Sequence, residues 1–140
     1  MNIEIYINTK KPTMNMKAAI DEYTKRLSAY CRIRIYYLPM TERKLNETIH
    51  TLLGQEHSAC FRITKEASNL SSEELSDNLN TMGIQGISHI CYLIGYPAAD
   101  SPVEALSLSQ ITMSDMLTGV VLCEQLYRCY RIIHNQPYHK

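Results

Sequence analysis

The sequence predicts an α/β fold built on a parallel sheet of about five strands. Short apolar or β-branched segments alternate with longer segments whose apolar residues have helical spacing. The segment 88–94 is almost wholly apolar, which is typical of a central strand covered on both faces. No linker, repeat or low-complexity tract divides the 140 residues. We therefore expect a single domain over residues 1–140.

Each element is predicted from its own pattern. Strands are indicated by β-branched and aromatic residues bounded by turn residues. The predicted strands are 2–8, 32–38, 58–63 and 88–94, with a further short apolar stretch at 106–111. Helices are indicated by helical spacing between a capping residue and a closing glycine or tail. The predicted helices run from Pro12-Thr13 to about Tyr30, from Thr41 to Leu53 with Gly54 as C-cap, from Ser71 to about Met82 with Gly83 ending the helix, and from Ser114 to about His134.

This arrangement predicts where a ligand binds. In open parallel sheets, ligands bind beyond the carboxyl ends of the strands. Three segments meet that condition: the loop after Ile63, the loop that begins at Gly95, and the stretch 106–113. A glycine directly after a buried strand allows a close approach of the backbone to a ligand. An ordinary turn at Gly95 is the competing interpretation.

Composition and charge exclude several classes of protein. Lys and Arg total 14, as do Asp and Glu, so the formal net charge is zero. This argues against a strongly basic nucleic-acid coat but leaves a local basic site open. The charge is uneven, with +4 over residues 1–50, −5 over 51–110 and +1 over 111–140. No apolar run approaches the roughly 20 residues of a membrane span, and the N-terminus lacks a basic signal region. We expect a cytoplasmic protein with no membrane association.

Cysteine and histidine spacing argues against a metal site. The five cysteines are odd in number and include no C-x-x-C pair, so we expect buried thiols rather than disulfides or a zinc ribbon. His50 and His57 flank a predicted helix end and are expected in solvent, and His89 opens a buried strand and is expected in the core. No H-x-x-x-H motif or Cys/His cluster is present, so no metal is expected.

The last helix and the tail that follows it carry the remaining signal. Glu124 and Arg128 are spaced i,i+4 in the favourable order. The tail 135–140 includes Tyr138, His139 and Lys140. Together they offer an aromatic face for a base, an acid–base group and a charge that attracts phosphate. A helix that packs on the sheet or on another subunit explains the helix, but it does not explain this tail.

Several segments together resemble RlmH, the family of small SPOUT methyltransferases that act on a pseudouridine of bacterial large-subunit ribosomal RNA. The resemblance covers the whole chain, and its closing pattern, E-Q-L-Y-R followed by P-Y-H-K, is specific. The segments that carry it are Ile94-Gly95, Leu106–Met113, Glu124–Arg128 and Pro137–Lys140, with a looser match at Leu70–Leu75.

The resemblance implies a parallel-sheet SPOUT fold with a C-terminal trefoil knot, a homodimer, and S-adenosylmethionine as methyl donor. It implies N3 of a pseudouridine in 23S ribosomal RNA, within the assembled ribosome, as acceptor. Acceptor recognition and catalysis would fall to Arg128, Tyr138, His139 and Lys140. Cofactor binding would fall to Ile63, Gly95, Tyr96, Leu108, Ser109, Gln110, Ile111, Thr112 and Met113.

The sequence departs from the family pattern on the cofactor side. The family loop I-G-G-x-x-G reads here Ile94-Gly95-Tyr96-Pro97-Ala98-Ala99, which keeps only the first glycine. The family segment L-D-x-x-G-K reads Ile63-Thr64-Lys65-Glu66-Ala67-Ser68. A left-handed backbone at Tyr96 or Ala99 would be strained, and the Tyr96 ring would compete with the cofactor for space.

Three readings therefore stay open. The first is an RNA methyltransferase. The second is an RlmH-like paralogue that binds the ribosome or RNA with weakened or lost cofactor binding. The third is a cysteine-based redox or metal protein, which the scattered cysteines disfavour. Calorimetry with S-adenosylmethionine separates the first two readings.

Overall fold

The computed structural model of the chain describes residues 1–98 and 103–138. Five parallel strands form one sheet in the order β2-β1-β4-β3-β5, which confirms the predicted fold class. Strand β4 lies at the centre, as its apolar sequence predicts. The strands are β1 (Asn2–Ile7), β2 (Arg32–Tyr37), β3 (Ser58–Ile63), β4 (His89–Ile94) and β5 (Glu104–Leu106).

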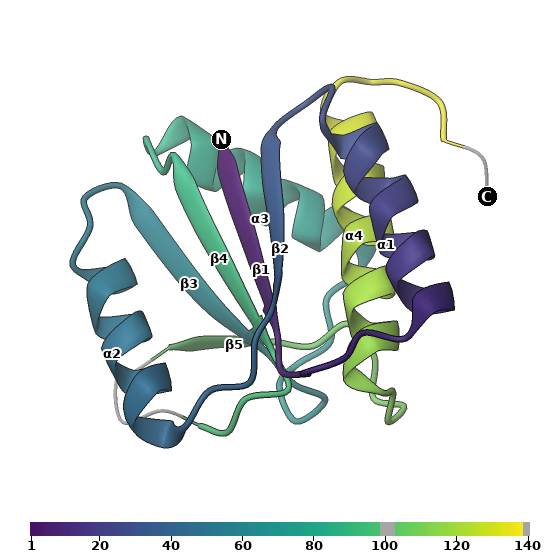
Figure 1. Cartoon of the computed structure of the whole chain (residues 1–140). Coiled ribbons are helices and arrows are strands. Elements are labelled where there is room, and N and C mark those ends of the chain that lie inside the picture. The colour runs from purple at the N-terminus through teal and green to yellow at the C-terminus, as the bar shows by residue number, and fades with distance from the viewer. Residues whose placement is uncertain (99–102, 139–140) are drawn as a thin grey trace.

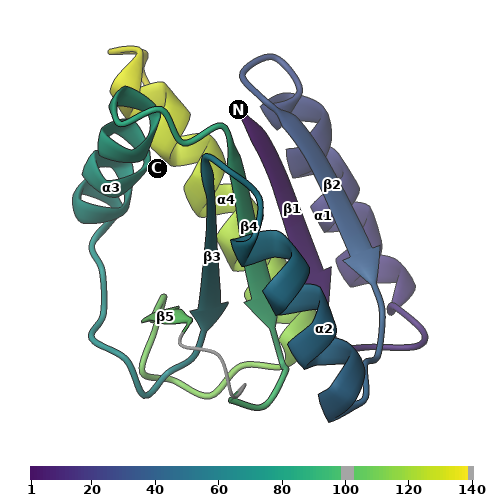
Figure 2. The same cartoon turned by 90° about the vertical axis from the view of Figure 1, so that its left-hand side faces the viewer.

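Four helices cover the two faces of the sheet unequally. Figures 1 and 2 show α1, α3 and α4 on one face and α2 alone on the other. The helices are α1 (Met14–Leu27), α2 (Glu42–Leu53), α3 (Ser72–Ile84) and α4 (Asp115–Ile133). Helix α4 packs against both α1 and α3. The larger core lies under these three helices, and a smaller apolar core lies under α2.

Alternation along the strands explains the two cores. Ile3, Ile5 and Ile7 of β1 are wholly buried beneath the three-helix face. Strand β4 is buried on both faces, with Tyr92 in the larger core and Leu93 in the smaller one. A one-residue slip in register would exchange these faces, so the hydrophobic pattern fixes the register.

The structure moves several of the predicted boundaries by one or more residues, and three of these differences are the largest or have a clear cause. Helix α3 continues through Gly83 to Ile84, because Gly83 keeps a helical backbone, so the predicted stop was wrong. Helix α1 ends at Leu27, and Tyr30 lies in the following turn with its ring stacked on Tyr130 at 5.4 Å. The last strand begins before the predicted stretch and overlaps it only at Leu106, since only Glu104–Leu106 pair with β3.

Several other predictions concern buried and exposed groups. All five cysteines are free and buried, as predicted. His50 and His57 are exposed, as predicted, and His89 is half-buried with Nδ1 3.2 Å from the side-chain oxygen of Gln55. Among the described helices, none is long and apolar enough to cross a membrane. The trefoil knot stays a prediction, because the connection 99–102 lies outside the described residues.

Candidate cofactor pocket and acceptor tail

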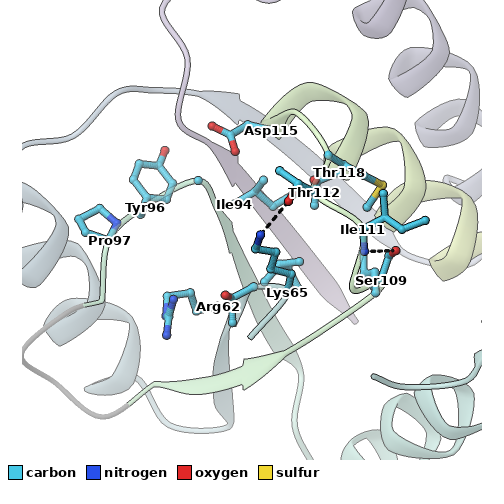
Figure 3. Close-up of a pocket in the computed structure, with 15 residues that line it drawn as sticks. Arg62, Lys65, Ile94, Tyr96, Pro97, Ser109, Ile111, Thr112, Asp115 and Thr118 are labelled. Carbon is cyan, nitrogen blue, oxygen red and sulfur yellow. Dashed lines mark hydrogen bonds between the residues drawn. The ribbon is translucent and has the colours of Figure 1, made fainter. Parts of the chain in front are cut away.

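A pocket of about 490 Å³ lies where β3 and β4 end and α4 begins. Figure 3 shows its lining side chains, most of which come from the three segments that the sequence placed at the carboxyl edge of the sheet. The start of α4 adds Asp115 and Thr118. Predicted cofactor residues in its wall are Ile63, Gly95, Tyr96, Leu108, Ser109, Ile111, Thr112 and Met113. Gln110 is exposed and is not part of the wall.

Gly95 has a backbone that only glycine adopts readily. Its φ is +83°, and a Cβ added there would lie 2.3 Å from Oδ2 of Asp115. The side-chain amide of Asn8 donates a hydrogen bond of 2.9 Å to the Gly95 carbonyl. The turn is therefore fixed by the neighbouring strand and by α4, so the glycine at the end of β4 is more than an ordinary turn residue.

Tyr96 directs its side chain out of the pocket. The ring is 5% exposed and packs in the smaller core under α2. Its hydroxyl donates a hydrogen bond to the Leu38 carbonyl, and burial raises the pKa of the phenol. Tyr96 does not have a positive φ, so the strain expected from losing the second family glycine is absent at this position. Figure 3 shows the ring beside Pro97, away from Lys65 and Thr112.

The segment after β5 forms the opposite wall. The Ser109 hydroxyl accepts a hydrogen bond of 3.0 Å from the Ile111 amide, which shapes the turn. Nζ of Lys65 donates a 2.7 Å hydrogen bond to the Thr112 hydroxyl, so this lysine is not simply solvated but joins the end of β3 to the segment after β5. Ile111 is 75% exposed although it lines the pocket.

Seven lining residues were not predicted from sequence as site residues: Arg62, Thr64, Lys65, Ile94, Pro97, Asp115 and Thr118. Asp115 lies in the first turn of α4, after the cap made by the Ser114 hydroxyl and the Leu117 amide. Burial raises the pKa of the Asp115 carboxyl. The sequence signal was an acid following a capping serine, a pattern that by itself indicates only helix stabilisation.

The acceptor tail is held against the middle of α4. Nη2 of Arg128 lies 2.9 Å from Oε1 of Glu124, and the Arg128 guanidinium carbon lies 4.3 Å from the centre of the Tyr138 ring. The Tyr138 hydroxyl donates a 2.5 Å hydrogen bond to the same Glu124 oxygen. Glu124 therefore organises two of the predicted acceptor-site residues, although the sequence indicated it only as the partner of Arg128.

The turn that leads into the tail is also fixed. Asn135 has a φ of 53°, and the Gln136 amide donates a 2.8 Å hydrogen bond to the Arg131 carbonyl, which closes α4. Nε of Arg131 donates a 2.9 Å hydrogen bond to the Pro137 carbonyl. His139 and Lys140, both predicted in the acceptor site, lie outside the described residues.

Comparison with known proteins matches residues 1–139 to the family model described as "Predicted SPOUT methyltransferase". The chain belongs to the SPOUT methyltransferase family. The α/β architecture with its five-stranded parallel sheet agrees with that assignment.

Curated relatives of this SPOUT methyltransferase match over the full length of both chains. A protein of Clostridium botulinum (strain Eklund 17B / Type B) is 34% identical over 159 residues and covers 100% of each chain. Proteins of Finegoldia magna and Shouchella clausii are each 33% identical with the same coverage. All three bear the name "Ribosomal RNA large subunit methyltransferase H". Similarity over the full length of both chains agrees with the resemblance found in the sequence.

The pocket of this SPOUT methyltransferase fits a nucleoside-sized cofactor. Its volume lies within the range of small-molecule sites. Ile94, Leu108 and Met113 supply apolar surface, and Arg62, Lys65 and Asp115 supply charge. Because Tyr96 packs under α2, the substitution of the family glycine leaves the pocket open.

The pocket and the tail lie apart within one chain. Glu124, which holds the tail, follows Asp115 by nine positions in α4. At about 1.5 Å per residue, this separation is roughly 14 Å along the helix axis. Figure 1 shows the tail leaving α4 at the end opposite the carboxyl edge of the sheet.

The Tyr96 hydroxyl is expected to stabilise the fold without contributing to cofactor binding. In Tyr96→Phe, the Leu38 carbonyl loses its buried donor, so the free energy of unfolding should fall by roughly 1–2 kcal/mol. Urea titration measures that loss, and calorimetry should give an unchanged affinity for S-adenosylmethionine. A large loss of affinity in a folded variant would contradict the structural role.

Proposed function

We propose that this SPOUT methyltransferase transfers a methyl group from S-adenosylmethionine to N3 of a pseudouridine in large-subunit ribosomal RNA, within the assembled ribosome. The family and the names of the full-length relatives support methyl transfer to ribosomal RNA. The observation that carries the proposal is the pocket, which three sequence-distant segments form although two family glycines are missing.

The chain's own residues would bind the cofactor in that pocket. The backbone turn at Gly95 brings the end of β4 close to the ligand, and the segment Leu108–Met113 closes the other side. S-Adenosylmethionine supplies an electrophilic methyl group. The fixed turn and the Lys65–Thr112 hydrogen bond hold the walls in place before the ligand enters, which reduces the entropic cost of positioning.

The acceptor nitrogen must lose its proton. We assign His139 as the general base that removes this proton. We assign Arg128 and Lys140 to stabilisation of the negative charge that develops on the pseudouridine ring. Tyr138 supplies an aromatic face for the pseudouridine. Nε of Arg128 is buried and has no acceptor among the described residues, so it can donate to an acceptor oxygen only after the side chains that cover it move.

We further propose that the complete site forms in a homodimer, with the tail of one protomer at the pocket of the other. Support comes from the separation of pocket and tail and from the exposed side of α4. Leu117 and Val121 are only half-buried and share a helix face with Glu124 and Arg128. This helix face, which carries both apolar and charged side chains, is suited to pairing with the same face of a second copy of the chain.

Mixing two variants of low activity tests the shared site. Gly95→Ala damages the pocket and Arg128→Ala damages the tail. If each site combines one protomer's pocket with its partner's tail, a mixed dimer retains one intact site. Random reassociation after mixing equal amounts should then restore about a quarter of the wild-type activity. Each variant mixed only with itself is the control, and no restored activity after verified subunit exchange would show that each site lies within one chain.

The reaction itself is tested on ribosomal RNA. We expect mass spectrometry to find one methylated pseudouridine in RNA from cells with the gene and none without it. Purified protein should methylate assembled ribosomes in preference to free RNA, because zero net charge gives little long-range attraction to RNA. An unchanged single-turnover rate in His139→Ala would remove that residue as the base. Ribosome binding without S-adenosylmethionine binding would instead support the non-catalytic paralogue.

A further inference from the structure

The Asp115 carboxylate is part of the pocket wall. No donor from residues 1–98 or 103–138 bonds to it. Its oxygens lie against the α-carbon of Gly95, where any side chain would collide with them. Partial burial raises the pKa of this carboxyl, as expected for a half-buried carboxylate that has no donor among the described residues. Such a group favours a bound cation over a neutral ligand.

The pocket also separates its charges. Arg62 and Lys65 come from the end of β3, whereas Asp115 comes from the start of α4. Figure 3 shows Asp115 near the start of α4, across the pocket from Arg62. A ligand with a carboxylate at one end and a cationic centre beyond it matches this distribution of charge. A neutral ligand of the same shape matches only half of it.

We propose that Asp115 is a specificity-determining residue that recognises the positive charge of the methyl donor and thereby distinguishes it from the spent product. This inference rests on the proposed use of S-adenosylmethionine. The donor carries a sulfonium, and after the S–CH3 bond breaks its electron pair stays on sulfur, leaving a neutral thioether. The attraction to Asp115 is thus present before transfer and absent after it, which favours product release.

A structural role for Asp115 predicts different behaviour. An acid in the first helical turn also stabilises the helix through its dipole, and that effect is independent of ligand charge. A carboxylate that accepts hydrogen bonds from ribose hydroxyls would hold donor and product equally. Only charge recognition changes the ratio of the two affinities.

The test is calorimetry of Asp115→Asn with three ligands. These are S-adenosylmethionine, S-adenosylhomocysteine, and sinefungin, which carries an amine in place of the methylsulfonium. The substitution keeps the shape of the side chain and removes its charge. We expect the affinity for the two cationic ligands to fall about tenfold, while the affinity for S-adenosylhomocysteine changes by less than about twofold. Glu66→Gln is the matched control, because it removes an exposed charge near the pocket that does not line it.

The outcomes separate the two proposals. Equal weakening of all three ligands in Asp115→Asn, or no weakening, overturns charge recognition and leaves the methyltransferase proposal standing. Failure of the wild-type chain to bind any of the three overturns both. If a thermal melt shows that Asp115→Asn does not fold, the affinities of the wild-type chain for the three ligands test the proposal. Charge recognition requires sinefungin and S-adenosylmethionine to bind more tightly than S-adenosylhomocysteine.

Discussion

Gly95→Ala is expected to abolish tight cofactor binding and to destabilise the fold. The new Cβ would lie 2.3 Å from Oδ2 of Asp115 and 2.5 Å from its carboxyl carbon, so the start of α4 or the end of β4 must move. A left-handed backbone at a residue with a Cβ adds roughly 1–2 kcal/mol of strain. We expect the affinity for S-adenosylmethionine to fall at least about tenfold, measured by calorimetry, and the midpoint of urea unfolding to fall with it.

Gly83→Ala is the matched control for this change. Gly83 lies in helix α3 with nothing within 4 Å of an added Cβ. The same substitution should therefore stabilise the protein by about 0.5–1 kcal/mol and leave cofactor binding unchanged.

Gly95→Ala acts through a collision with the Asp115 carboxylate and through backbone strain. A double-mutant cycle with Asp115→Ala separates these two effects. Removal of the carboxylate relieves the collision but not the backbone strain. Wild-type affinity for the cofactor in Gly95→Ala would show that the ligand binds elsewhere.

Arg128→Ala is expected to reduce methylation of ribosomes by roughly 100-fold while leaving cofactor affinity within about threefold of the wild-type value. The guanidinium pairs with Glu124 at 2.9 Å and covers the Tyr138 ring, so its loss weakens the packing of Tyr138 and removes a charge from the acceptor site. Single-turnover methylation with labelled S-adenosylmethionine measures the rate, and calorimetry measures the affinity. Arg128→Lys should recover only part of the rate, because an ammonium cannot lie flat over the ring.

Arg43→Ala supplies the control for Arg128→Ala. Arg43 also pairs with a glutamate four residues away, Glu47 at 3.2 Å, but its side chain is 90% exposed and lies on α2. Its loss should change neither rate nor affinity. A wild-type rate for folded Arg128→Ala would remove Arg128 from the acceptor site, and an equal loss in Arg43→Ala would point to a general effect of charge on ribosome binding.

Much of the fold follows from local patterns in the sequence. Strand β3 was predicted with its exact bounds, and the Ser114 cap places the start of α4 correctly. The capping box of Ser71 and Glu74 likewise marks the start of α3. Local patterns suffice here because strand alternation, helix caps and breakers act within a few residues of one another. The misplaced stop at Gly83 shows the limit, because burial of Leu79 and Met82 extends the helix beyond a residue of low helix propensity.

The candidate site was predicted only in part. Parallel topology places Ile63, Gly95 and the segment 106–113 at one edge of the sheet, and the structure brings them around one pocket. The sequence alone suggested that Tyr96 obstructs this pocket. The phenol instead packs under α2 and donates to the Leu38 carbonyl, a contact between residues 58 positions apart. No local pattern specifies a contact at that separation.

By itself, the sequence determined the α/β class, the three segments at the carboxyl edge and the tail that resembles an acceptor site. Only the tertiary structure decided that Tyr96 leaves the pocket open, that Asp115 lies against Gly95 with no donor among the described residues, and that Glu124 holds Tyr138. The physical reason is the range of the forces. Spacing and capping are local, whereas the direction of a buried side chain and the partners of a charge depend on whichever distant segments pack beside it.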